Sequence, residues 1–130
     1  MISSQKEIGM EIKILLVDDA VDFVNYVKKR LVLRGMVVSA AYNGKEALDL
    51  IQKQPFDIVV LDMLMPGIDG IETLKKIKKI KPKIEVILLT GHGTVRAASE
   101  AMKAGAVDFL QKPCDINMLI DSINNACETK

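Results

Sequence analysis

The sequence predicts an α/β protein in which helices cover both faces of an open parallel sheet. Four short runs of Val, Ile and Leu are bounded by polar or turn residues and show no alternation of apolar and polar positions. Such runs are typical of strands buried on both faces of a parallel sheet. Segments with apolar residues at helical spacing lie between them, so strand and helix alternate along the chain. Right-handed crossovers then place the helices in two outer layers.

The predicted strands are the apolar runs themselves. A fifth run, weaker than the other four, lies between Gly105 and Lys112. A helical stripe follows it, so it completes a fifth strand–helix unit. The strands are predicted at Ile14–Val17, Met36–Val38, Ile58–Leu61, Val86–Leu89 and Ala106–Leu110.

Each predicted helix carries an apolar stripe, and several have start or stop signals. Gly35 and Gly105 are plausible C-terminal stops, whereas Asn43 and Asp115 are candidate N-caps. Pro55 lies just beyond the end of the second helix. The helices are predicted at Asp22–Arg34, Lys45–Gln54, Ile71–Lys79 and Thr94–Ala104, with a last one striped by Ile116, Leu119, Ile120 and Ile123.

Composition bounds the class of protein. The 130 residues suffice for one domain, and an apolar share of 49% is enough for a core without a metal or disulfide. The 18 Lys and Arg residues nearly balance the 17 Asp and Glu residues, which argues against a nucleic-acid-binding surface. The lysine-rich segment 75–83 is therefore interpreted as a solvated helix face.

Localisation follows from what the chain lacks. No apolar run approaches the ~20 residues of a membrane span. Cys114 and Cys127 do not form the spacing of a disulfide framework, so reduced thiols are the default. We expect a cytoplasmic protein that binds neither membrane nor nucleic acid, with a flexible N-terminal lead at residues 1–11.

Side chains suited to phosphoryl and metal chemistry follow four of the five predicted strands. Asp18 and Asp19 come after the first strand, Asp62 after the third, Thr90 after the fourth and Lys112 after the fifth. The carboxyl ends of parallel strands meet at one edge of the sheet, where chemistry in such folds concentrates. We therefore expect three carboxylates, a hydroxyl and an ammonium to meet there.

The three carboxylates predict a metal site. They repel one another, and a divalent cation relieves that repulsion; an all-oxygen ligand set suits Mg²⁺. A metal held in this way can bind a phosphoryl oxygen, while Lys112 and the Thr90 hydroxyl take the others. Asp62, alone at its strand end, is then the natural nucleophile, because a carboxylate can accept a phosphoryl group.

At these residues the sequence resembles the receiver domains of two-component response regulators. The matching strings are Leu15–Asp19, Leu61–Gly70, Leu89–Gly91 and Asp108–Pro113, in the right order and each in its strand context. The resemblance covers about residues 12–127. It implies a flavodoxin-like (βα)5 three-layer sandwich with strand order 2-1-3-4-5. It also implies phosphoryl transfer from a histidine kinase, or a phosphotransfer protein, onto Asp62.

Family roles carry over residue by residue. The resemblance implies that Asp18 and Asp19 form the acidic Mg²⁺ site, with Asp62 and the backbone carbonyl of Leu64 as further ligands. It makes Thr90 the switch hydroxyl and Lys112 the phosphoryl-binding ammonium.

The resemblance also implies how the switch is transmitted. Phe109 would turn inward when Thr90 moves toward the phosphoryl group, although burial in the core explains a Phe at this position equally well. The Lys112–Pro113 bond is expected to be cis. The face formed by helix 4, strand 5 and helix 5 would report phosphorylation to an output domain or effector protein, and dimerisation through this face stays open.

Leu64 and His92 lie two residues after Asp62 and Thr90 and would flank the path of an attacking water. An apolar Leu64 cannot orient that water, so we predict slow self-dephosphorylation. Leu64→Asn should speed phosphate loss, measured as the decay of the phosphorylated form by intact mass. An unchanged decay rate would contradict water positioning as the limiting factor.

Other function classes fit parts of the pattern. A Mg²⁺-dependent phosphohydrolase of the haloacid-dehalogenase type also combines an Asp nucleophile with Thr and Lys, but it places a second Asp two residues after the nucleophile, where this chain has Leu64. A nucleotide- or flavin-binding module would need a glycine-rich fingerprint that follows none of the strands. A receiver-like interaction module that is never phosphorylated remains a third alternative.

Overall fold

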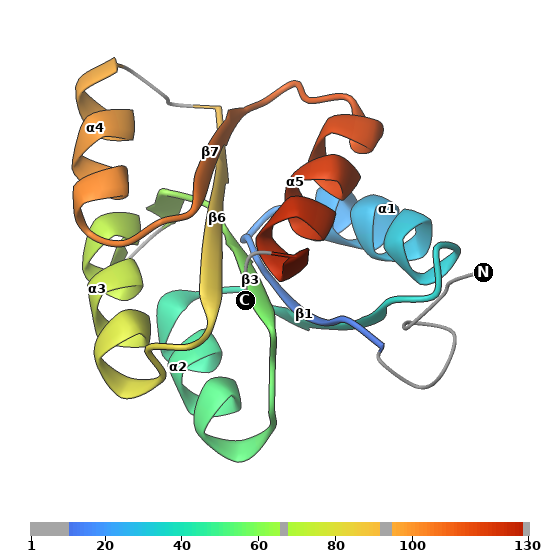
Figure 1. Ribbon diagram of the computed structural model, residues 1–130, viewed down its shortest axis with the longest axis horizontal. Coiled ribbons are helices and arrows are strands. Elements are labelled where there is room, and N and C mark those ends of the chain that lie inside the picture. The colour runs from blue at the N-terminus through green and yellow to red at the C-terminus, as the bar shows by residue number, and fades with distance from the viewer. Residues whose placement is uncertain (1–10, 66–67, 92–94, 129–130) are drawn as a thin grey trace.

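Five parallel strands form the central sheet, as predicted. The computed structural model describes residues 11–65, 68–91 and 95–128, apart from the side chains of residues 64, 65, 68 and 69. The strand order is β2-β1-β3-β6-β7, which is 2-1-3-4-5 when the strands of this sheet are counted alone (Figure 1). This order confirms the flavodoxin-like arrangement. The strands are β1 (Lys13–Val17), β2 (Val37–Ala41), β3 (Ile58–Leu61), β6 (Glu85–Thr90) and β7 (Asp108–Gln111).

The helices lie on both faces of the sheet and close two separate cores. Helices α1 (Val21–Val32) and α5 (Ile116–Glu128) cover one face, and α2 (Gly44–Lys53), α3 (Gly70–Ile80) and α4 (Val95–Lys103) cover the other (Figure 1). Successive side chains of a strand point to opposite faces. In β1, Ile14 and Leu16 therefore pack in the α1–α5 core, whereas Leu15 and Val17 pack in the α2–α3–α4 core. This two-sided burial explains why the strands read as unbroken apolar runs.

The predicted helix caps at Asn43 and Asp115 and the predicted glycine after α1 lie at the helix ends. The Asn43 side chain accepts a hydrogen bond from the Glu46 N–H at 2.9 Å, and the Glu46 carboxylate accepts one from the Tyr42 N–H at 2.8 Å, which is a reciprocal cap of α2. Asp115 accepts from the Asn117 N–H at 2.8 Å at the start of α5. Gly35 follows α1 with a φ of +85°, a conformation that glycine adopts at little cost.

The structure corrects the predictions at the edge strands. Strand β2 begins at Val37 and continues to Ala41, beyond the predicted end at Val38, because Leu15, Leu16 and Val17 of β1 each find a partner in 39–41. The partners Ser39, Ala40 and Ala41 have little intrinsic strand preference, so tertiary pairing decides. The fifth strand likewise begins at Asp108 rather than Ala106.

A small antiparallel hairpin was not predicted. It pairs β4 (Leu64–Met65) with β5 (Ile68–Asp69) and lies between Asp62 and α3. Two-residue strands are too short for a periodic pattern to reveal them. No helix among the described residues has both the length and the apolar character needed to cross a membrane.

Candidate functional site

The three predicted carboxylates meet at one edge of the sheet. Asp18 follows β1 and Asp62 follows β3, and ladder hydrogen bonds continue past both strand ends: the Asp18 N–H donates to the Ala41 carbonyl at 3.1 Å, and the Asp62 N–H donates to the Val17 carbonyl at 2.9 Å. Asp18, Asp19 and Asp62 each bring one carboxylate oxygen within 4.8 Å of the others. Asp18 and Asp62 are buried and Asp19 is exposed, so the cluster opens to solvent on one side.

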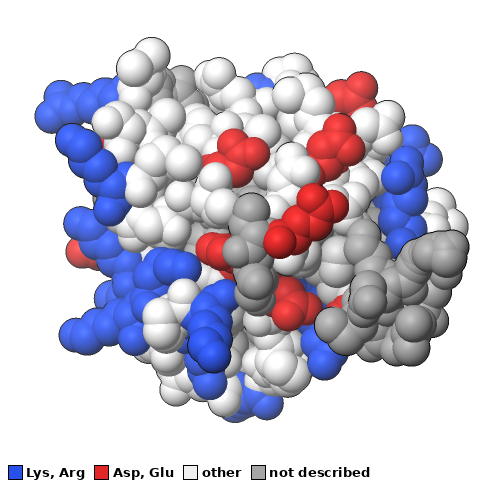
Figure 2. Space-filling view, viewed as in Figure 1, with Lys and Arg blue, Asp and Glu red and all other residues white. Residues whose placement is uncertain are grey.

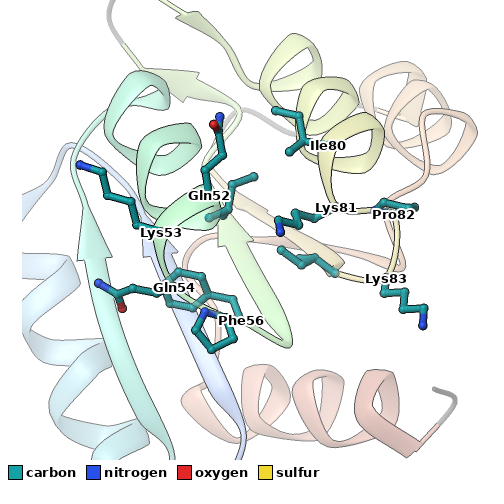
Figure 3. A pocket seen from close by; sticks show the side chains of 11 residues that line it. Gln52, Lys53, Gln54, Phe56, Ile80, Lys81, Pro82 and Lys83 are labelled. Carbon is teal, nitrogen blue, oxygen red and sulfur yellow. The ribbon is translucent and has the colours of Figure 1, made fainter.

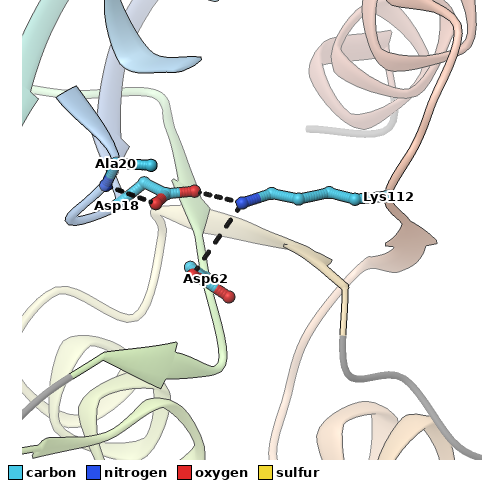
Figure 4. Close-up of polar contacts among 4 residues, drawn as sticks. All are labelled: Asp18, Ala20, Asp62 and Lys112. Atoms are coloured by element: carbon cyan, nitrogen blue, oxygen red, sulfur yellow. Dashed lines mark hydrogen bonds and ion pairs between the residues drawn. The ribbon is translucent and has the colours of Figure 1, made fainter. Parts of the chain in front are cut away.

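Lys112 follows the edge strand β7, and its side chain reaches the cluster at the ends of β1 and β3. Its Nζ lies 2.5 Å from Oδ2 of Asp18 and 3.9 Å from Oδ2 of Asp62 (Figure 4). The Lys112 N–H donates to the Thr90 carbonyl at 2.8 Å, which ties the segment after β7 to the end of β6. The Lys112–Pro113 bond is cis, as expected. One ammonium thus neutralises one of three carboxylates, which leaves the cluster with a net negative charge.

Asp18 does not act as the cap of α1. The N-cap position is Ala20, which makes no side-chain capping bond. The Asp18 carboxylate instead accepts from the Ala20 N–H at 3.0 Å through Oδ1, while Oδ2 faces Lys112 (Figure 4). The hydrogen bond from Ala20 therefore holds the Asp18 carboxylate beside Lys112, so that it does not cap the amino end of α1.

Thr90 and Phe109 lie on neighbouring strands beside the cluster. Thr90 is fully buried at the end of β6, and its register partner in β7 is Gln111. Phe109 is half-buried and packs against the α2–α3–α4 core. The switching role of both residues remains a prediction.

Leu64 and His92, the two positions expected to flank an attacking water, lie partly or wholly outside the described residues. The Leu64 backbone lies in β4, where its register partner is Asp69. The proposed ligand role of the Leu64 carbonyl stays a prediction, and its side chain lies outside the described part of the structure. His92 lies outside the described residues altogether.

The donor set fits Mg²⁺. Two oxygens bound to one Mg²⁺ lie at most about 4.2 Å apart, so carboxylate oxygens within 4.8 Å need only a small rotation. The exposed side of Asp19 leaves room for the waters that Mg²⁺ retains. Beneath Asp18 and Asp62 the core is closely packed: the hollow that they share with Leu16, Val24 and Val60 measures only about 10 Å³.

Phe23 belongs to this site, although the sequence patterns did not single it out. The Lys112 ammonium lies 4.2 Å from the centroid of the Phe23 ring. Phe23 projects from the first turns of α1, one residue before the apolar stripe that begins at Val24. A cation over an aromatic face is stabilised by the ring quadrupole. The sequence offers one indication that Phe23 lies near the site: it is one of only three Phe residues and lies four residues after Asp19.

Phe23→Leu should slow phosphoryl acceptance roughly fivefold, because about 1 kcal/mol of cation–π energy no longer orients the Lys112 ammonium. The measurement is the initial rate of phosphorylation by a small phosphodonor. Tyr26→Leu is the matched control, since the Tyr26 ring on the same helix faces Arg30 at 5.6 Å. Equal rates for Phe23→Leu and Tyr26→Leu would contradict a positioning role for Phe23.

The fold and this edge define a class: flavodoxin-like α/β domains that gather carboxylates and a lysine at the carboxyl ends of their strands. The model of the response regulator receiver domain matches residues 14–124. The chain therefore belongs to the response regulator receiver domain family.

Individual relatives agree with this assignment. The chain is 39% identical over 118 residues to the transcriptional regulatory protein ZraR of Klebsiella oxytoca, covering 91% of this chain but 27% of ZraR. The chain thus spans about a quarter of the length of the curated relatives it matches.

Solved structures agree as well. A receiver domain from Clostridium thermocellum superposes with a TM-score of 0.86 at 38% identity, covering 91% of this chain and 95% of that one. A Burkholderia pseudomallei response regulator, solved with a phosphorylated aspartic acid, a calcium ion and citrate, gives 0.84 at 27% identity, covering 92% and 71%.

Proposed function

We propose that residues 12–127 are a phosphorylation-controlled switch of two-component signalling, and that Asp62 is its phosphoacceptor. The observation that carries the proposal is the buried Asp62 carboxylate at the end of β3, with the Lys112 ammonium 3.9 Å away and two more carboxylates beside it. The phosphorylated aspartic acid of the Burkholderia relative supports it. The donor is a phosphohistidine of a sensor histidine kinase or phosphotransfer protein in the cytoplasm.

The reaction is a phosphoryl transfer between side chains. An oxygen of Asp62 forms a bond to phosphorus while the phosphorus–nitrogen bond of the phosphohistidine breaks, and the imidazole nitrogen keeps the electron pair. Lys112 and the Thr90 hydroxyl bind oxygens of the transferred group. Asp18, Asp19, Asp62 and the Leu64 carbonyl would hold Mg²⁺, which when bound supplies positive charge that offsets the charge of the phosphoryl group.

The signal leaves through α4, β7 and α5. Thr90 ends β6, from which the chain leads to α4, and Phe109 lies on β7. This face carries apolar side chains in contact with solvent: Val95 is 90% exposed, Met102 48% and Met118 56%. A phosphoryl group favours one of two arrangements of these elements, and the exposed apolar side chains then contact an output domain, an effector or a second receiver.

The domain acts as a switch rather than as an enzyme with turnover. The exposed Asp19 carboxylate places the cluster at the surface, where a donor carried by another protein can approach it. Release of phosphate is then limited to slow attack by water. Multiple turnovers of a small phosphate ester per Asp62 would favour the phosphohydrolase alternative.

The test is incubation with acetyl phosphate and Mg²⁺, followed by intact mass. Wild type should gain one phosphoryl group and Asp62→Asn none, because the amide is not a nucleophile of comparable strength. Asp57→Asn is the matched control, since Asp57 precedes the same strand β3 at its opposite end. No mass gain in wild type, or an equal gain in Asp62→Asn, would overturn the proposal.

A further inference from the structure

A second hollow lies at the opposite edge of the sheet from the carboxylates. It measures about 550 Å³ and lies between the C-terminal ends of α2 and α3, where the chain enters β3 and β6 (Figure 3). Phe56 lines it and precedes Asp62 by six residues of largely extended chain, or roughly 20 Å. The pocket is therefore separate from the phosphoacceptor site.

The pocket has an apolar floor and a basic rim. Ile51 and Ile84 form buried parts of its wall, and Ile80 is 40% exposed at its mouth. Lys53 comes from the α2 side and Lys81 and Lys83 from the α3 side. In Figure 3 Lys81 extends across the opening toward α2, while Lys53 and Lys83 extend outward on either side.

The rim charge is not compensated within the described residues. None of the ion pairs described involves Lys53, Lys81 or Lys83. The acidic residues closest in sequence have other partners: Asp57 accepts from the Lys13 N–H at 2.9 Å, and Glu85 lies 3.7 Å from Lys78. In Figure 2 most of the basic side chains lie on the α3 side and at the lower edge, whereas most of the acidic side chains lie nearer the middle.

We infer that this pocket binds an acidic peptide segment of a partner protein, with one aliphatic or aromatic side chain inserted between Ile80 and Phe56. Carboxylates on both sides of that anchor meet Lys53 on one wall and Lys81 and Lys83 on the other. The separation of the lysines on two walls favours an elongated ligand over a compact anion. A volume of about 550 Å³ falls within the range of ligand pockets, and the lysine stems cover further apolar surface of the anchor.

Because the pocket is separate from Asp62, the inference does not depend on phosphorylation, and Asp62→Asn should bind the same peptides as wild type. The experiment selects twelve-residue peptides from a random phage-displayed library on the wild-type domain, after depletion on the triple variant Lys53→Glu, Lys81→Glu, Lys83→Glu. Recovered peptides should carry Asp or Glu around a Leu, Phe or Trp. Their amide shift changes in the ¹⁵N-labelled domain should centre on Phe56, Ile80 and Ile84.

Matched variants separate this pocket from general charge. Binding of the recovered peptides should weaken at least tenfold in the triple variant and in Ile80→Asp. It should change less than twofold in Lys75→Glu, Lys76→Glu, Lys79→Glu, which makes the same charge change on α3 outside the pocket. Circular dichroism establishes that each variant folds.

Four outcomes would overturn the inference. The recovered peptides could lack acidic enrichment, or their shift changes could centre on a different face. Binding could also survive replacement of the apolar anchor by Ser, or duplex DNA of equal charge could bind as well as the peptides; either result would show a general polyanion surface.

Discussion

Lys112→Met should reduce phosphoryl acceptance about a hundredfold while tightening Mg²⁺ binding about tenfold. The Lys112 ammonium lies 2.5 Å from Asp18 and 3.9 Å from Asp62. It therefore competes with a cation for the Asp18 carboxylate, and its removal leaves Oδ2 of Asp18 to the cation. The same ammonium is the charge that a transferred phosphoryl group would meet, and loss of one preorganised electrostatic contact typically costs two to three orders of magnitude in rate.

The same change should destabilise the metal-free domain by about 2 kcal/mol, because Asp18 and Asp62 remain buried without their counter-charge. The figure is below that of a fully buried pair, since the Lys112 side chain is 23% exposed. Saturating Mg²⁺ should then raise the melting temperature of Lys112→Met more than that of wild type. The measurements are calorimetric Mg²⁺ titration, thermal melts with and without Mg²⁺, and phosphorylation rates.

Lys103→Met is the control for the loss of one positive charge, because Lys103 is exposed at the end of α4. It should leave Mg²⁺ affinity, melting temperature and rate unchanged. Weaker Mg²⁺ binding in Lys112→Met would show that the ammonium orients the carboxylates rather than competing with the cation.

The fold was predictable because its signals are local and consistent with one another. Each central strand is buried on both faces, so Ile58–Leu61 is an unbroken apolar run, and β3 has the predicted bounds. The caps at Asn43 and Asp115 depend on contacts within three residues. Where tertiary pairing decided, as for Ser39–Ala41 in β2, the predicted boundary was wrong.

The candidate site was predictable for a different reason. Parallel strands bring their carboxyl ends to one edge, so the positions of Asp18 and Asp62 after their strands were enough to expect the two side chains near each other. The contacts that orient these groups depend on elements distant in sequence. The Phe23 ring meets Lys112 across 89 positions, and no pattern in the sequence indicates that α1 and the segment after β7 approach each other there.

Gly70 is the other position whose importance appears only in three dimensions. A Cβ at Gly70 would lie 2.4 Å from the Cα and 2.7 Å from the carbonyl oxygen of Met63, the residue after Asp62. The Gly70 N–H also donates to that carbonyl at 2.8 Å. Because the obstructing atoms belong to the backbone, a side chain cannot simply rotate away, and the segment that follows Asp62 must shift.

Gly70→Ala should therefore destabilise the domain by about 1–3 kcal/mol and slow phosphorylation of Asp62 at least tenfold. Helix propensity alone predicts the opposite sign: Ala is favoured over Gly by about 0.5–1 kcal/mol inside a helix and by less at a first residue such as Gly70, so the direction of the change decides between the two effects. Gly91→Ala is the matched control beside the same site: among the described residues, its Cβ would come nearest to the Lys112 Cβ, at 4.0 Å, an ordinary van der Waals distance. Chemical denaturation measures stability, and intact mass measures phosphorylation. A stabilised Gly70→Ala would mean that the backbone at Met63 yields at little cost; a stable but unphosphorylated variant would instead show that the position of Asp62 depends on this close approach of α3.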